Sequence, residues 1–160
     1  GVTKGSFFHH FENKEELFRQ AVEHFEELSL TDFYDDGKPL SLWEFCQAYL
    51  DFFWSHEEEE EQNFGRDILF LEEAYRRLPS IMETHRESVR RDVERWSSVI
   101  ERAKASGEIV SSLPSSDLAR LFLSIEDSVL LEGFITHLPA PQARLHMEAR
   151  FRTIYQMLKP

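Results

Sequence analysis

The sequence predicts an all-α protein, and three observations lead to that prediction. Apolar residues recur three and four positions apart along most of the chain, which is the period of an amphipathic helix. No segment keeps the strict alternation of a half-buried strand bounded by hairpin turns. Proline and glycine separate the periodic segments, as at Gly65, Pro79, Gly107 and Pro114. With 160 residues the chain can bury a core, and we expect one domain with at most a small appendage.

The first segment, residues 1–11, predicts a short helix that begins after Thr3. The Thr3 hydroxyl can accept a hydrogen bond from a free backbone N–H, and Val2 and Phe7 have the spacing of a hydrophobic staple. Phe7 and Phe11 share one face. Because so short a helix is not stable alone in water, that face must pack against other helices.

A second helix is expected to begin after Asn13, an N-cap residue with Glu16 in the capping-box position. Lys14 follows at the first helical position, where a cation opposes the helix dipole. Two interpretations of Lys14 remain open. It is either a solvated surface lysine, or it completes a phosphate site with the helix N-terminus. Glu15 and Glu16 count against the second interpretation because their charges would repel a phosphate.

The middle of the chain predicts a central helix. Residues 40–54, LSLWEFCQAYLDFFW, are apolar on nearly every face, as expected for a helix that others surround. Cys46 lies in this run and is expected to be a reduced core residue. As the one cysteine of the sequence it cannot form an internal disulfide, so we expect a cytoplasmic protein. The glutamates at 57–61 repel one another and predict a solvated loop or helix end.

The last two periodic segments, residues 116–136 and 142–158, predict a pair of long helices. Glu126 and Asp127 interrupt the strongly apolar stretch 118–134. At least one of these carboxylates should face inward or into an interface, where it needs a partner. A ligand cation or hydroxyl could be that partner, and so could an arginine from a facing chain. The sequence leaves the pocket and the interface equally open.

Large aromatic side chains are more numerous than a simple helical bundle needs. Aromatic cavities with few polar groups are typical of small-molecule sites, although each ring taken singly fits an ordinary core. The candidate ligand-binding residues are Trp43, Tyr49, Phe52, Phe53, Phe64, Phe70, Trp96, Phe122 and Glu126.

Composition and motifs exclude several functions. The net charge of −12 repels nucleic acid and anionic membranes on average, so any contact with DNA must come from a local basic patch. No apolar stretch is long enough to span a membrane. The sequence has no HExxH, CxxC, nucleophile elbow or glycine-rich phosphate loop, which argues against an enzyme. No cofactor or metal is expected, because His9 and His10 are adjacent and point apart on a helix.

The opening string, GVTKGSFFHHFENKEELF, resembles the recognition helix and the following helix of TetR-family transcriptional regulators. Residues 1–17 follow the family pattern nearly position by position, and residues 103–134 resemble its penultimate helix and preceding turn more loosely. The resemblance implies a helix-turn-helix remnant over residues 1–30. A helical-bundle domain for ligand binding and dimerisation would follow over residues 31–160. Two further helices of the helix-turn-helix domain would precede Gly1.

The resemblance also implies roles for single residues. Phe8 departs from the family, which commonly has a tyrosine there. Without the hydroxyl a phosphate contact is lost, and plain core packing is the alternative for Phe8. The positions that meet DNA in the family are Thr3, Lys4, Gly5, Phe8, His9, His10 and Lys14. The family pairs its last two helices across a two-fold axis, and the implied interface residues are Leu121, Ile125, Leu130, Phe151, Ile154 and Tyr155.

Together these inferences predict a ligand-responsive repressor that acts as a homodimer on a palindromic operator. Its expected partners are double-stranded DNA, a small and largely apolar ligand, and a second copy of the chain, with no membrane. The alternative is a ligand-binding or interaction dimer that does not bind DNA. The acidic balance of the chain favours that alternative slightly.

Overall fold

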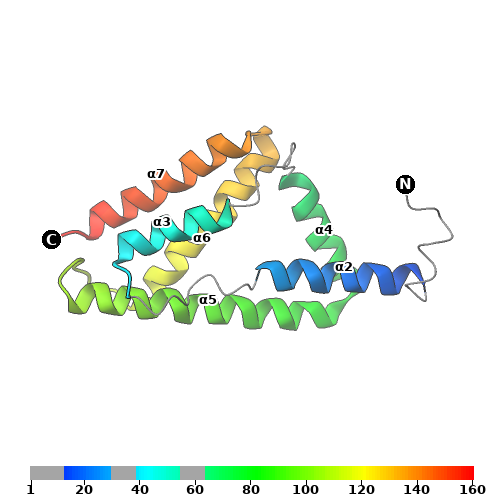
Figure 1. Ribbon diagram of the computed structural model, residues 1–160, viewed down its shortest axis with the longest axis horizontal. Coiled ribbons are helices and arrows are strands. Elements are labelled where there is room, and N and C mark those ends of the chain that lie inside the picture. The colour runs from blue at the N-terminus through cyan, green and yellow to red at the C-terminus, as the bar shows by residue number, and fades with distance from the viewer. Residues whose placement is uncertain (1–12, 30–38, 55–63) are drawn as a thin grey trace.

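The structure is a computed structural model, and it describes residues 13–29, 39–54 and 64–160. For residues 24–29 and 64–68 it describes the backbone alone. The described residues form six helices and no strand, so the all-α prediction is confirmed. The helices are α2 (Lys14–Ser29), α3 (Leu42–Phe53), α4 (Phe64–Arg77), α5 (Pro79–Ala105), α6 (Ser115–Thr136) and α7 (Ala140–Leu158) (Figure 1). The short helix expected over residues 1–11 and the glutamate run lie outside the described residues.

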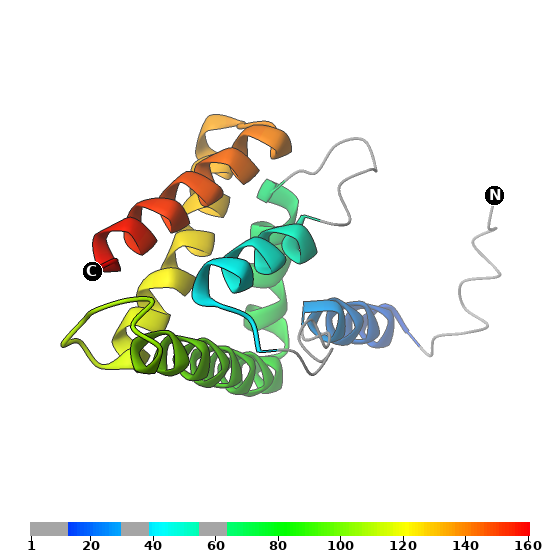
Figure 2. The same ribbon diagram turned by 60° about the vertical axis from the view of Figure 1, so that its left-hand side comes forward.

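The long helix α5 packs against α3, α4 and α6 (Figures 1 and 2). α6 crosses α5 and packs against it, and α7 runs back antiparallel to α6 after a short turn. α3 packs against both α5 and α7. α4 contacts α5 and α6, and α2 meets α4 near the beginning of α5. The molecule therefore has a four-helix part, α3 with α5–α7, and a smaller part where α2 and α4 meet.

Each part has its own core. The main core lies among α3, α5, α6 and α7, with Trp96, Phe122 and Phe151 as its largest fully buried side chains. Cys46 belongs to it, as expected, and burial raises the pKa of its thiol. The smaller core consists of Val22, Ala74 and Ile81, with Phe18, Phe70, Tyr75 and Leu78 packed against it.

The beginning of α3 is held by a residue that follows α5. Ser41 and Glu44 form the capping box of α3, as their spacing requires. The Glu108 carboxylate accepts two more hydrogen bonds, from the backbone N–H groups of Leu42 (3.0 Å) and Trp43 (3.2 Å). It also accepts one from the Tyr155 hydroxyl at 3.0 Å. Glu108 thus joins the ends of α3, α5 and α7, and a negative charge suits the helix N-terminus.

Candidate functional site

Most of the residues expected to contact DNA lie outside the described residues. These are Thr3, Lys4, Gly5, Phe8, His9 and His10. Lys14 is described, and it is an exposed side chain at the first position of α2. The part of the candidate DNA interface that the structure describes is therefore the N-terminal turn of α2.

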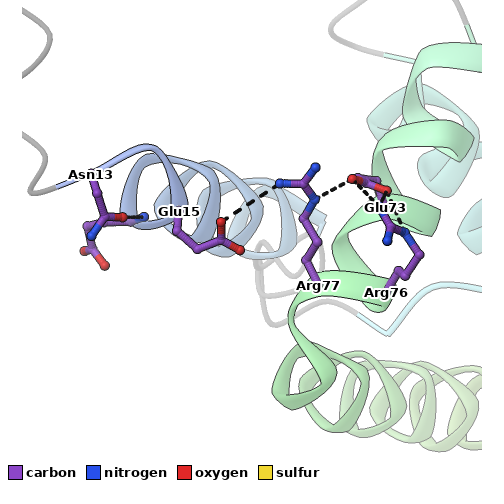
Figure 3. Close-up of polar contacts among 6 residues, drawn as sticks. Asn13, Glu15, Glu73, Arg76 and Arg77 are labelled. Carbon is purple, nitrogen blue, oxygen red and sulfur yellow. Dashed lines mark hydrogen bonds and ion pairs between the residues drawn. The ribbon is translucent and has the colours of Figure 1, made fainter.

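Asn13 caps α2, as expected from the sequence. Its side-chain oxygen accepts a hydrogen bond from the backbone N–H of Glu16 at 2.9 Å (Figure 3). That bond uses one of the free N–H groups with which every helix begins. The remaining groups and the Lys14 ammonium are a suitable combination for an anion.

The two glutamates of this turn are both engaged by cations. The Glu16 carboxylate accepts hydrogen bonds from Arg19 and Gln20, each as short as 2.6 Å, and the Arg19 guanidinium holds the pKa of Glu16 below its usual value. Glu15 lies 4.0 Å from the Arg77 guanidinium, at the end of α4 (Figure 3). Arg19 and Arg77 therefore offset part of the repulsion that these two carboxylates would exert on a phosphate.

α2 is seated on α4 by apolar contacts as well. The rings of Phe18 and Phe70 meet edge to face at 5.6 Å, and the Arg77 guanidinium lies 5.5 Å from the centre of the Phe18 ring. Val22, one turn further along α2, is fully buried in the smaller core. Phe70 was expected in a ligand pocket, but it packs in this smaller core.

The second candidate site is the aromatic centre of the main core, around Trp96. Its ring is stacked on Phe122 at 5.1 Å and meets Phe45 edge to face at 4.7 Å. Tyr49 and Phe151 approach the same ring at 5.4 and 5.7 Å. Three helices, α3, α6 and α7, thus bring aromatic rings to Trp96 of α5, in edge-to-face, stacked and tilted arrangements.

The other expected pocket residues are more scattered. Phe53 is half-buried and stacked on Tyr49 at 6.1 Å, and Phe52 is half-buried on the same helix. Trp43 lies at the opposite end of α3, between Tyr155 at 5.3 Å and the Arg152 guanidinium at 4.6 Å. The side chain of Phe64 lies outside the described residues.

Glu126 is the carboxylate that contacts the aromatic centre, through Tyr49. It faces inward and accepts a hydrogen bond from the Tyr49 hydroxyl, whereas Asp127 is exposed. Burial raises the pKa of Glu126 to about 7, against the opposing effect of the Tyr49 hydrogen bond. The charges of Asp127 and Asp92 raise it further. At least one carboxylate was expected to face inward or into an interface, with a ligand or an arginine of a facing chain as its partner, and the partner found is a tyrosine of the same chain.

The residues expected in a dimer interface divide into two groups. Ile125, Phe151 and Tyr155 are buried within the single chain, because their faces of α6 and α7 point toward α3 and α5. Leu130 and Ile154 are half-buried and Leu121 is exposed, so these three can still meet a partner. The most exposed apolar residues of the two helices, none of which was expected at the interface, are Leu131, Ile135, Leu145 and Met157.

An ion-pair network ties α6 to α7 near these exposed residues. Glu132 pairs with Arg150, and one of its oxygens lies 3.3 Å from Nδ1 of His146. Arg150 also donates to the Ser128 hydroxyl at 2.8 Å. Exposed apolar side chains and paired charges therefore occur together along the α6–α7 hairpin.

Residues 1–21 match the family model described as bacterial regulatory proteins, tetR family. Neither the curated proteins nor the solved structures contain a match to the chain. The family match ends within α2 and includes Asn13 and Lys14. The match covers 21 of the 160 residues and shows that this stretch is similar to regulatory proteins of the tetR family. Within the described ranges, no helix is both long and apolar enough to cross a membrane.

Proposed function

We propose that the protein is a ligand-responsive transcriptional repressor that binds a palindromic operator as a homodimer in the cytoplasm. The observation that carries the proposal is the family match over residues 1–21, which ends in the first turns of α2. The arrangement of that helix supports it. Lys14 is exposed at the helix N-terminus, and the neighbouring glutamates are paired with arginines.

In this proposal Lys14 binds a phosphate of the DNA backbone and Thr3, Lys4, Gly5, Phe8, His9 and His10 form the rest of the reading surface. A chain with a net charge of −12 is repelled by DNA as a whole, so the contact depends on such local cations. The packing of α2 against α4 fixes the direction in which the N-terminal turn of α2 points.

The outer face of α6 and α7 is the proposed dimer interface. Exposed Leu121 and half-buried Leu130 and Ile154 are among the apolar side chains that a second copy could cover. A two-fold dimer places two reading heads on one side, as a palindromic operator requires. Half-sites one helical turn apart correspond to about 34–36 Å between recognition helices.

The proposed ligand is small and largely apolar, and the aromatic centre around Trp96 and Tyr49 is where it would bind. Such a ligand changes DNA binding only by the difference between its affinities for two conformations of the dimer. Glu126 would be the polar group that orients it.

The test is DNA binding by the intact natural protein, with duplexes selected from random sequence. We expect a palindromic selected site and saturable binding that weakens with salt. Lys14→Ala should weaken binding to all sequences about equally and lower the salt slope by about one counterion. Lys159→Ala, a second exposed lysine at the far end of the molecule, is the matched control. A stable dimer that shows no salt-dependent duplex binding would instead favour an interaction dimer without DNA binding.

A further inference from the structure

The carboxylate of Glu126, on α6, has one oxygen that is bonded within the chain and one that is not. Oε2 accepts a hydrogen bond from the Tyr49 hydroxyl of α3. Among the residues that the structure describes, no donor is bonded to Oε1 and no cation pairs with either oxygen. Glu126 is half-buried, and Oε1 is not among the fully buried side-chain atoms that lack a partner. A donor that enters from solvent can therefore reach this oxygen.

The charges that act on Glu126 are negative. They belong to Asp92 of α5 and Asp127 of α6. Arg95 lies 3.7 Å from Asp92 and forms an ion pair with it. The arginines at the end of α4 pair with Glu73 beside α2 (Figure 3). The surroundings of Glu126 therefore favour an incoming positive charge over a neutral or a negative one.

Aromatic rings adjoin this carboxylate on the side of α3. The Tyr49 ring is stacked on Phe53 at 6.1 Å and meets Trp96 edge to face at 5.4 Å. Tyr49 and Phe53 are half-buried, whereas Trp96 is fully buried. The accessible edge of the aromatic centre thus offers rings for an apolar body. The faces of such rings also attract cations.

We propose that the ligand of this site is an organic cation, a protonated amine whose N–H donates to Oε1 of Glu126 while its apolar body packs against Tyr49 and Phe53. This assignment rests on the proposed function, which places a ligand at the aromatic centre. A hydroxyl in the same place could donate a hydrogen bond but would leave the ionised carboxylate without a counter-charge. An anion would be repelled by Glu126, Asp92 and Asp127.

The test compares three probes that share one biphenyl body: 4-phenylbenzylammonium, 4-phenylbenzyl alcohol and 4-phenylbenzoate. Equilibrium dialysis against the intact natural protein at pH 8 gives their dissociation constants. This pH lies above the Glu126 pKa of about 7, so the carboxylate is mostly ionised. The ammonium should bind about tenfold more tightly than the alcohol, and the benzoate should bind most weakly. The same head groups on a single phenyl ring repeat the comparison with a smaller body.

Two variants assign the preference to Glu126. Glu126→Gln keeps the shape of the side chain without its charge, so it should weaken binding of the ammonium about tenfold and leave binding of the alcohol nearly unchanged. Glu101→Gln removes the same charge from an exposed position of α5 and should keep the wild-type preference. It controls for the attraction of any cation by the net charge of the chain.

If Glu126→Gln does not fold, nuclear Overhauser contacts in the wild-type protein decide the question. The CH₂ group beside the ammonium should contact the side chains of Glu126 and Tyr49, and its absence from both would overturn the assignment. Equal affinities for the ammonium and the alcohol, or a preference that survives in Glu126→Gln, would overturn it as well but leave a ligand site in the aromatic centre. If none of the probes binds, the ligand site of the proposed function fails together with this assignment, while DNA binding is judged by its own assay.

Discussion

Replacing Glu126 by glutamine should change how the unfolding free energy of the protein depends on pH. The ordinary pKa of this carboxyl is 4.5, and burial raises it to about 7 in the folded protein. The folded state therefore holds a proton that the unfolded state has already released. The stabilisation that the proton provides is complete below pH 4.5 and is lost as the pH rises through 7.

The magnitude follows from the two pKa values. The interval between 4.5 and about 7 corresponds to about 3 kcal/mol of unfolding free energy. Glu126 keeps some exposed surface, so water screens part of this, and we expect about 1–3 kcal/mol. Glutamine has nearly the same shape and cannot ionise. The variant should therefore match the wild type near pH 5 and exceed its stability at pH 8.

Urea unfolding followed by far-UV circular dichroism at pH 5, 6, 7 and 8 measures both proteins. The quantity of interest is the difference between the two unfolding free energies at each pH, because the other titrating groups contribute equally to both proteins and cancel. Glu101→Gln is the matched control, since Glu101 is an exposed acid and is not among the groups that shift the pKa of Glu126. A difference that stays constant with pH would refute the reasoning, and so would one that grows toward low pH.

Three other predictions test the packing described above. Phe122→Ala should cost about 3–5 kcal/mol of unfolding free energy in urea titrations, because it empties a fully buried position stacked on Trp96. Glu108→Ala should cost about 1–3 kcal/mol and increase amide exchange in the first turn of α3, since it removes the acceptor of two backbone N–H groups. Ile135→Glu should shift the protein toward monomer in analytical ultracentrifugation with little change in monomer stability, because Ile135 is 66% exposed. An unchanged dimer would remove this face of α6 from the interface.

Helices were predictable from this sequence because the apolar periods are long and the caps are local. α3, α6 and α7 lie within two residues of the ranges expected, and Asn13 caps α2 as its position before a charged turn suggested. These features depend on neighbours three and four residues apart. Contacts between residues far apart in the sequence were harder to predict. Nothing in the local pattern around Glu108 indicates that it reaches α3 and Tyr155.

In the candidate sites, too, the residue types were predictable from the sequence, but their neighbours in space were not. The sequence indicates which residues are large and apolar, but α6 and α7 carry more apolar positions than one face can hold. Which of them fill the chain's own core depends on where α3 and α5 pack. Phe151 was therefore expected at an interface and lies in the core, whereas Leu145 and Met157 are exposed. Phe70 was similarly expected in the pocket, and the position of α2 explains why it packs on Phe18.

Glu108 and Glu126 are two carboxylates near one core that have opposite electrostatic surroundings. Glu108 accepts hydrogen bonds from two N–H groups at a helix N-terminus and from Tyr155, so its negative charge is compensated where it lies. Glu126 has the Tyr49 hydroxyl as its bonded partner and two carboxylates as charged neighbours. The hydrogen bonds to Glu108 hold the ends of three helices together, whereas burial favours the neutral form of Glu126. Replacing Glu108 should therefore cost stability throughout the neutral range, and replacing Glu126 should cost none at pH 8. The different effects of the two substitutions on the unfolding free energy at pH 8 distinguish an acid that holds the fold together from one whose ionisation destabilises it.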